Sequence, residues 1–218
     1  MINMEPHLSI LDADRLLKKL IRGDKKTNQN LDPESFYKHS RVASNFSYLV
    51  SCAYEHQGIN VDVELIRVSA LLHDIGKPVV KPSEREKDPE LIFDSIYGER
   101  YLEEIGLPEI ADVIRPSFTT YELIQLKPKL FPKIKPRDLI PKTNKQKIVV
   151  YADTHITGSG KYVSFNQRMR DMRERYGEGS LIVQSLDIGG EERLRKLNYE
   201  VEGKAGLEFK NKTYSLLV

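Results

Sequence analysis

Four side chains able to bind a metal ion stand on helix faces that are otherwise apolar: His39, His73, Asp74 and Asp153. Each of them lies three, four or seven residues from an apolar neighbour, so each shares the buried face of its helix. A buried carboxylate that lacks a partner is costly, and these faces carry no Lys or Arg that could neutralise one. A divalent cation would satisfy all four groups at once.

The donor types narrow the choice of ion. Two imidazoles and two carboxylates form a mixed nitrogen and oxygen set, which suits Mn, Fe, Co, Ni or Zn better than Ca. Adjacent residues on a helix point about 100° apart, so His73 and Asp74 can reach one ion only near a helix end. Gly76 and Pro78 predict that end. Taken alone, His39 would most often be a satisfied core histidine, and Asp153 could equally be a helix cap.

The elements that must position these residues are helices, because the hydrophobic period is helical almost throughout. It predicts helices over about residues 9–22, 33–57, 62–75, 88–105, 108–115, 145–156, 163–177 and 191–199, with a helical turn or two over 118–126. Residues 206–218 are β-prone at both ends, which allows a small C-terminal hairpin. We therefore expect an all-α fold, with residues 1–218 forming a single domain.

Composition excludes several other classes of protein. Of the 218 residues, 30% are charged and 39% hydrophobic, as in a soluble globular chain. No apolar run approaches the roughly 20 residues needed to cross a bilayer. The first residues lack a basic stretch followed by an apolar one, so we expect no secretory signal. Cys52 is the only cysteine, which excludes an internal disulfide, and its apolar surroundings predict a buried side chain. A cytoplasmic location is the simplest expectation.

Residues 127–147, the basic segment, hold eight Lys or Arg and one Asp, a net charge of +7 that leaves −5 for the rest of the chain. Four prolines predict that it is extended rather than helical. It is either an exposed loop covering Leu130, Phe131 and Ile134 or a positive rim that draws an anionic substrate. Binding of nucleic acid is less favoured, because the segment has few aromatic side chains to stack on bases.

Three stretches together resemble the HD-domain superfamily of metal-dependent phosphohydrolases, whose pattern is H…HD…D. They are "HSRVA" at His39, "LLHDIGKP" at His73 and Asp74, and "KIVVYAD" at Asp153. The similarity runs from about residue 34 to 176, leaving an N-terminal helix and a C-terminal extension outside it. The resemblance implies an HD-domain-like helical bundle in which these four residues bind one divalent ion, either Mg or one of the transition metals named above.

The resemblance also implies a reaction. A bound ion would lower the pKa of its water from 15.7 toward roughly 7 to 9 and so supply hydroxide to attack phosphorus. Asp74 could hold or deprotonate that water, and Lys77 is placed to hold a substrate phosphate. We therefore expect a hydrolase acting on a phosphomonoester or phosphodiester of a small substrate, most simply a nucleotide, with no membrane partner.

One departure from the family pattern concerns a second metal. Some members carry further histidines after the HD pair, but here Tyr97 and Ser117 stand where those would be expected. This predicts a mononuclear site and argues against the two-metal cyclic-dinucleotide phosphodiesterases. Arg115 could replace metal charge with guanidinium charge toward a phosphate. The alternatives are a metal-bound, catalytically inactive module that binds a nucleotide or a protein, and a structural helical domain with internally paired polar residues.

The remaining histidines and arginines have simpler interpretations. His155 lies two residues after Asp153, on another helix face, and we predict it at the surface together with His7 and His56. Four arginines alternate with acidic residues and predict a solvated helix face: Arg168, Arg170, Arg173 and Arg175.

Overall fold

The computed structural model describes residues 8–23, 32–85 and 93–206, and within these ranges the fold is all-α, as the sequence predicts. The helices are α1 (Ile10–Gly23), α2 (Pro33–His56), α3 (Val63–Leu72), α4 (Gly76–Val79), α5 (Pro82–Arg85), α6 (Asp94–Glu104), α7 (Pro108–Ile114), α8 (Thr120–Leu126), α9 (Asn144–Asp153), α10 (Phe165–Tyr176), α11 (Leu181–Ser185) and α12 (Glu191–Ala205). A 3-10 turn spans Pro136–Leu139 and a π turn spans Leu186–Gly190. None of the described helices is long and apolar enough to cross a bilayer. The predicted C-terminal hairpin, at 206–218, lies almost wholly outside the described residues.

Local sequence sets several helix starts. Asp32 caps α2 by accepting hydrogen bonds from the backbone of residues 34 and 35, next to a proline in the first turn. A capping box, in which Thr143 and Gln146 each bond the other's backbone, begins α9. The same arrangement of Ser164 and Gln167 begins α10. The starts of α9 and α10 are therefore set by hydrogen bonds between residues close together in the sequence.

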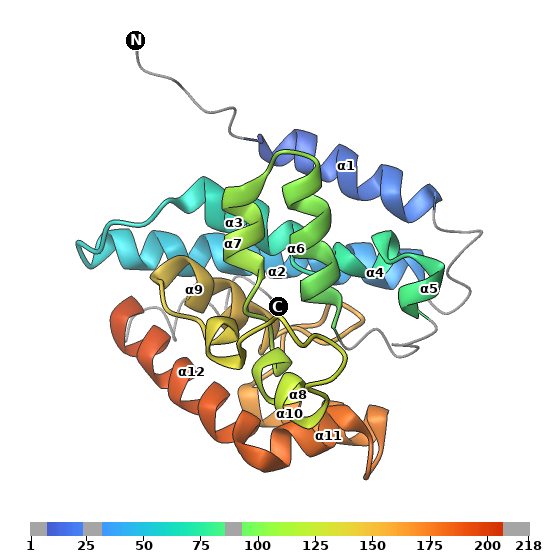
Figure 1. Cartoon of the computed structure of the whole chain (residues 1–218). Helices are drawn as coiled ribbons and strands as arrows, with labels where there is room; N and C mark the ends of the chain where they lie inside the picture. The colour runs from blue at the N-terminus through green and yellow to red at the C-terminus, as the bar shows by residue number, and fades with distance from the viewer. Residues whose placement is uncertain (1–7, 24–31, 86–92, 207–218) are drawn as a thin grey trace.

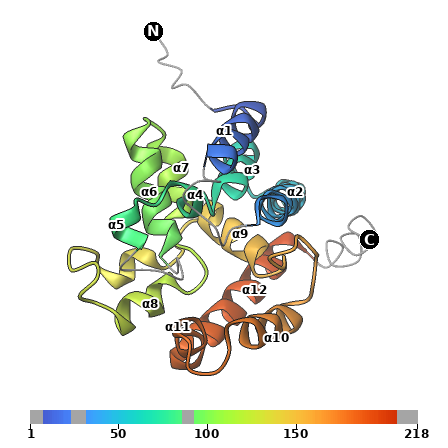
Figure 2. The ribbon, with the colours of Figure 1, turned by 90° about the vertical axis from the view of Figure 1, so that its right-hand side faces the viewer.

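The long helix α2 packs against several of the other helices. It contacts α3, α9 and α12, and α3 in turn contacts α1, α7 and α9. Figure 1 shows α1, α6 and α7 on one side of α2, with α8, α10, α11 and α12 on the other. The view in Figure 2 places α9 between these two groups, where it touches both α2 and α12. The ends of α2, α3 and α9 can therefore meet inside the molecule.

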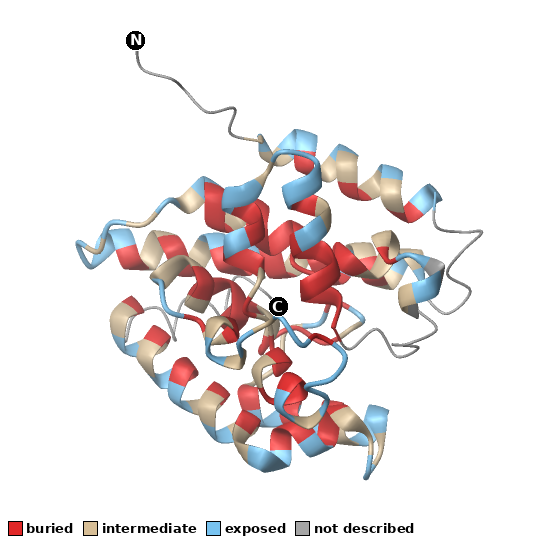
Figure 3. Ribbon diagram, viewed as in Figure 1, coloured by how far each residue is buried: buried red, intermediate tan, exposed pale blue. Residues whose placement is uncertain are grey.

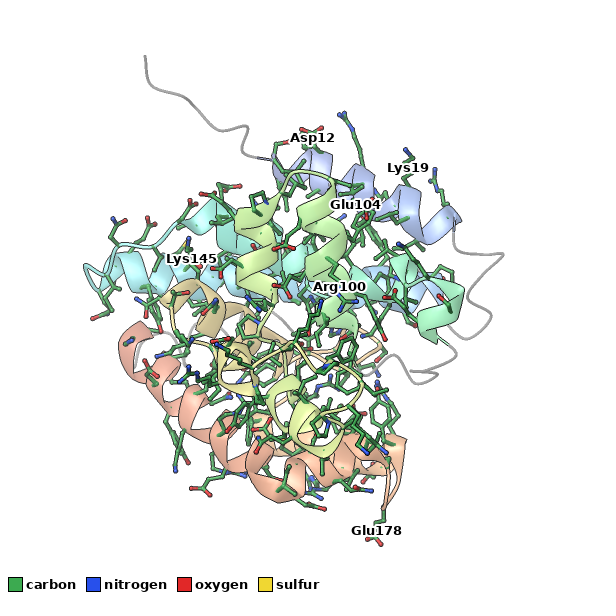
Figure 4. The ribbon with its side chains drawn as sticks, viewed as in Figure 1. Asp12, Lys19, Arg100, Glu104, Lys145 and Glu178 are labelled. Atoms are coloured by element: carbon green, nitrogen blue, oxygen red, sulfur yellow. The ribbon has the colours of Figure 1, made fainter. Side chains whose placement is uncertain are left out.

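Burial follows this arrangement. Figure 3 shows the buried residues gathered on the facing sides of α2, α3, α6, α7 and α9. Charged side chains such as Asp12, Lys19 and Glu178 point outward from the ribbon (Figure 4). Cys52 is only partly buried, so the sequence overstated its burial, whereas His56 is exposed as predicted. His7 lies outside the described residues.

The helix predicted over 62–75 is interrupted. α3 ends at Leu72 and α4 begins at Gly76, so His73 and Asp74 lie in the turn between them. Gly76 therefore starts a helix rather than ending one. A Cβ atom at Gly76 would lie 1.8 Å from the carbonyl oxygen of Asp94, so glycine is needed here because the α6 backbone packs directly against it.

Before α9 begins at Asn144, the basic segment is irregular apart from its 3-10 turn, as its prolines predict. Phe131 is buried and packs edge-on against Phe93, with ring centroids 5.0 Å apart, while Leu130 stays exposed. Lys147, at the end of this segment, binds Glu200 on α12 through hydrogen bonds of 2.7 and 2.9 Å. Phe131 is thus shielded from solvent, while the charged side chains nearer the middle of the segment are exposed.

Candidate metal centre

The fold brings together all four side chains that the sequence selected. His39 comes from α2, His73 and Asp74 from the turn between α3 and α4, and Asp153 is the last residue of α9. The His39 Nε2 atom lies 3.1 Å from Nε2 of His73 and 3.4 Å from Oδ1 of Asp153. Oδ1 of Asp74 lies 3.5 Å from the His73 Nε2 atom. The four donor groups therefore surround one point.

Backbone carbonyls fix which ring nitrogens face that point. His39 Nδ1 lies 2.9 Å from the carbonyl oxygen of Thr157, and His73 Nδ1 lies 2.8 Å from that of Ala70. A carbonyl only accepts, so each Nδ1 carries the hydrogen and each neutral ring turns an Nε2 lone pair inward. Two lone pairs 3.1 Å apart repel unless a proton or a metal ion lies between them. The ring orientation is the one found when a second partner orients a metal-binding histidine.

Burial raises the free-energy cost of an unbalanced charge at the centre. His39, His73 and Asp74 are 4%, 4% and 7% exposed. Burial alone would lower the pKa of His73, but the Asp74 and Asp153 carboxylates outweigh it and raise that pKa to about 9. Burial would raise the pKa of Asp74, but Lys77 and His73 hold it well below its usual range. Without an ion, protons and a lysine thus balance the carboxylates.

The donor set fits a divalent transition metal. His39, His73 and Asp74 each offer a donor atom, and these atoms all lie within 4.8 Å of one another. Asp153 stands just outside this group of three but turns Oδ1 toward both imidazoles, at 3.4 and 3.8 Å. Nitrogen and carboxylate donors in this mixture are the ligands that Mn, Fe, Co, Ni and Zn share.

Lys77 lies beside the centre in contact with two carboxylates. Its Nζ atom is 2.5 Å from Oδ2 of Asp74 and 3.1 Å from Oδ2 of Asp94, the first residue of α6. Burial raises the pKa of Asp94 to about 7, although the Lys77 charge opposes the shift. Asp94 could not be selected from the sequence, because no periodic or motif signal separates it from other acidic residues at helix starts.

Arg115 lies at the end of α7, where its Nε atom is 3.1 Å from Oε1 of Glu99. Its ion pair is directed at α6 rather than at the carboxylates of the centre. Tyr97, one of the two residues that replace the expected histidines, is buried against Phe131 with ring centroids 6.0 Å apart. Ser117 is partly exposed. Neither of these two positions offers a histidine or carboxylate for a second ion.

Two predictions about surface residues are wrong. Arg168 is only 5% exposed, and its guanidinium NH2 lies 3.8 Å from Oδ1 of Asp153. The alternation of charges around Arg168 predicts a solvent-exposed helix face. Arg168 instead lies among the buried residues of α10, and its guanidinium approaches Asp153 at the end of α9 and the ring of Phe118. Arg170 and Arg175 on the same helix are exposed as predicted.

His155 is 4% exposed rather than at the surface. Helix α9 ends at Asp153, so helical spacing no longer says where residue 155 points. Its Nδ1 lies 3.0 Å from the carbonyl oxygen of Val163, and its Nε2 lies 2.8 Å from Asn198 on α12. Burial lowers the pKa of His155. The residue therefore ties the end of α9 to α12.

Fold and site together define an all-α protein with a buried centre of histidine and aspartate side chains. The HD domain family model matches residues 36–156, and the chain belongs to this family. A relative from Methanocaldococcus jannaschii, the uncharacterized protein MJ0778, is 28% identical over 75% of this chain and 90% of its own length.

Two solved structures are also similar, both of the HD domain of the L. monocytogenes phosphodiesterase PgpH. The one in complex with cyclic-di-AMP is 16% identical, with a TM-score of 0.48, covering 93% of this chain and 99% of that one. The other is 19% identical, with a TM-score of 0.43, covering 85% and 99%.

Proposed function

We propose that the protein is a metal-dependent phosphohydrolase acting on a small phosphorylated substrate, most simply a nucleotide. His39, His73, Asp74 and Asp153 are the proposed ligands of one divalent ion. The observation that carries the proposal is the pair of Nε2 atoms held 3.1 Å apart by two Nδ1 hydrogen bonds to backbone carbonyls. Membership of the HD domain family supports the same conclusion.

The bound ion would supply an acidified water and polarise a phosphoryl oxygen. Asp74 is the proposed residue that holds the attacking water. Its low pKa keeps it ionised at neutral pH, so it accepts a hydrogen bond from water and orients it toward phosphorus. Lys77, which contacts Asp74, maintains that ionised state.

Lys77 and Arg115 are also the proposed contacts to the substrate phosphate. Each now faces carboxylates: Lys77 those of Asp74 and Asp94, and Arg115 that of Glu99. A substrate phosphate would have to compete with these carboxylates for the two cations. The contribution of each cation to substrate binding can be measured by substitution. Replacing either with Ala is expected to raise KM, with a larger effect at Lys77 because it adjoins a proposed metal ligand.

The second candidate is a metal-bound module that binds a nucleotide or a protein partner without catalysis. Tyr97 favours it, because an aromatic residue packed against Phe131 occupies the position of an expected histidine. A mononuclear centre could then hold an anion without turning it over. The two candidates share the metal and differ in turnover.

Metal analysis of the purified protein tests both candidates first. The wild-type chain and its His56→Ala variant should hold about one transition-metal ion, whereas His73→Ala should hold much less. His56 is a suitable control because it is exposed on the same helix as His39. No metal in any of the three proteins would refute both candidates.

A substrate panel then separates enzyme from binding module. It should contain nucleoside mono- and polyphosphates and cyclic nucleotides, including the cyclic-di-AMP found with the PgpH domain, each with Mn, Co and Ni. Release of phosphate or nucleotide that is lost in Asp74→Asn supports the hydrolase. Absence of turnover with every ion, together with a nucleotide-dependent rise in melting temperature, supports the binding module.

A further inference from the structure

We infer that Arg168 is a phosphate-binding residue of the centre. No comparison assigns it this role, and the alternation of charges along its helix predicts an exposed side chain instead. The inference rests on the proposed function, because it assumes that an ion held by Asp153 carries a phosphoryl group. The ligand class is a phosphate monoester, a phosphodiester or inorganic phosphate, whose oxygens a guanidinium binds well.

The position of Arg168 supports this role. Its side chain leaves α10 and reaches Oδ1 of Asp153 at 3.8 Å. The same oxygen lies 3.4 Å from His39 Nε2 and 3.8 Å from His73 Nε2. An ion held by Asp153 would thus lie beside the Arg168 NH2 group. A phosphoryl oxygen on that ion would be a partner for the N–H donors of Arg168.

The guanidinium of Arg168 has donors left over. Of its five N–H groups, one donates from NH1 to Asp171 at 2.9 Å, and 3.8 Å to Asp153 is too long for a hydrogen bond. Its Nε is buried and has no hydrogen-bond partner within the described part of the chain. The ring of Phe118 lies 5.7 Å from the guanidinium carbon and covers one face. A buried cation held this way gains from an anionic ligand.

Arg193, another largely buried arginine, shows what a structural role looks like in this fold. Its guanidinium binds both carboxylate oxygens of Glu122, at 2.7 and 2.8 Å, and the carbonyl oxygen of Phe118 at 2.7 Å. Arg193 is thus held by a bidentate pair, the strong form of this interaction. Arg168 lacks such a pair and faces the centre instead.

Titration of the metal-loaded protein with inorganic phosphate, followed by calorimetry, tests the inference without depending on turnover. Arg170→Ala is the matched control, because Arg170 is exposed on the same helix. We expect Arg168→Ala to raise the Kd for phosphate roughly 10- to 100-fold, the loss expected for hydrogen bonds between charged groups. Arg168→Lys should be intermediate, and Arg170→Ala should match the wild type.

Metal content measured on the same samples separates binding from positioning. Retained metal with weakened phosphate binding supports the inference. Metal lost in parallel from Arg168→Ala and Arg168→Lys would overturn it, because Arg168 would then serve to position Asp153. Equal phosphate affinity in Arg168→Ala and Arg170→Ala would also overturn it, as would a metal-loaded wild-type protein that does not bind phosphate.

The two proposals can fail separately. If no substrate is hydrolysed but phosphate binding still depends on Arg168, the catalytic proposal is wrong and this inference stands. If a substrate is hydrolysed and Arg168→Lys leaves both KM and phosphate affinity unchanged, only the inference is wrong. Should Arg168→Ala not fold, Arg168→Lys and Arg168→Gln provide the comparison, since both retain a long polar side chain.

Discussion

Replacing Gly76 with Ala should destabilise the protein strongly, because the added side chain would overlap the backbone of α6. Gly76 directly follows the turn that holds His73 and Asp74. The added Cβ atom would lie 1.8 Å from the carbonyl oxygen of Asp94, 2.6 Å from its carbonyl carbon and 2.8 Å from the nitrogen of Gly98. Ordinary contacts of this kind are 3.4–4 Å. All three atoms belong to the α6 backbone, so no side-chain rotation can relieve the overlap.

The magnitude follows from what must move. Relief requires α4 and α6 to separate by more than about 1 Å, in a core where such misfits typically cost about 1–3 kcal/mol and occasionally more. A clash with backbone belongs at the upper end, so we expect a loss of about 3 kcal/mol or more. For a chain of this size that corresponds to a fall in Tm of roughly 6–12 °C. Because His73 and Asp74 lie in the turn that leads into α4, metal affinity should fall as well.

Denaturant unfolding of Gly76→Ala and Gly203→Ala, measured beside the wild type, is the assay. Gly203 lies exposed within α12, and a Cβ atom added to it would meet nothing within 4 Å beyond the adjacent backbone of its own helix. Alanine there should therefore stabilise by about 0.5–1 kcal/mol. The two variants make the same chemical change with opposite expected signs. A Gly76→Ala protein within about 0.5 kcal/mol of the wild type would refute the reasoning.

Four further predictions concern the site and its surroundings. Since the pKa of His73 is raised to about 9, the metal-free protein carries an extra proton on this imidazole at pH 7. Metal binding should release that proton, so metal affinity should increase as pH rises toward 9. Calorimetry in buffers of different ionisation enthalpy would measure the release, and a binding heat that does not depend on the buffer would contradict it. The same raised pKa stabilises the metal-free fold fully below pH 6.5, and this contribution should be lost as pH rises through 9. Asn198→Ala should cost about 2 kcal/mol in unfolding free energy, because it leaves His155 buried without its α12 partner; an unchanged denaturation midpoint would count against that contact. If the basic segment attracts the substrate, Lys129→Glu with Lys133→Glu should lower kcat/KM several-fold at low salt and little at high salt, whereas a salt-independent or absent effect would leave the segment as a covering loop.

The sequence by itself determined the fold class and selected the four side chains that the fold brings together. Helical period places His39 and Asp153 on buried faces, and burial of polar groups without partners calls for something that neutralises them. Short-range chemistry, such as the Asp32 cap and the capping boxes of α9 and α10, also fixes several helix starts. These signals are local, so they can be read from neighbouring residues alone.

Tertiary structure decided what each buried group faces. Gly76 reads as a helix end in sequence, but its need for glycine comes from α6, a helix that begins 18 residues later. The Lys77–Asp94 contact, the burial of His155 against Asn198 and the approach of Arg168 to Asp153 likewise join different elements. Periodicity reports which side of a helix is buried, whereas the partner on that side depends on how distant helices pack, and no local pattern encodes this.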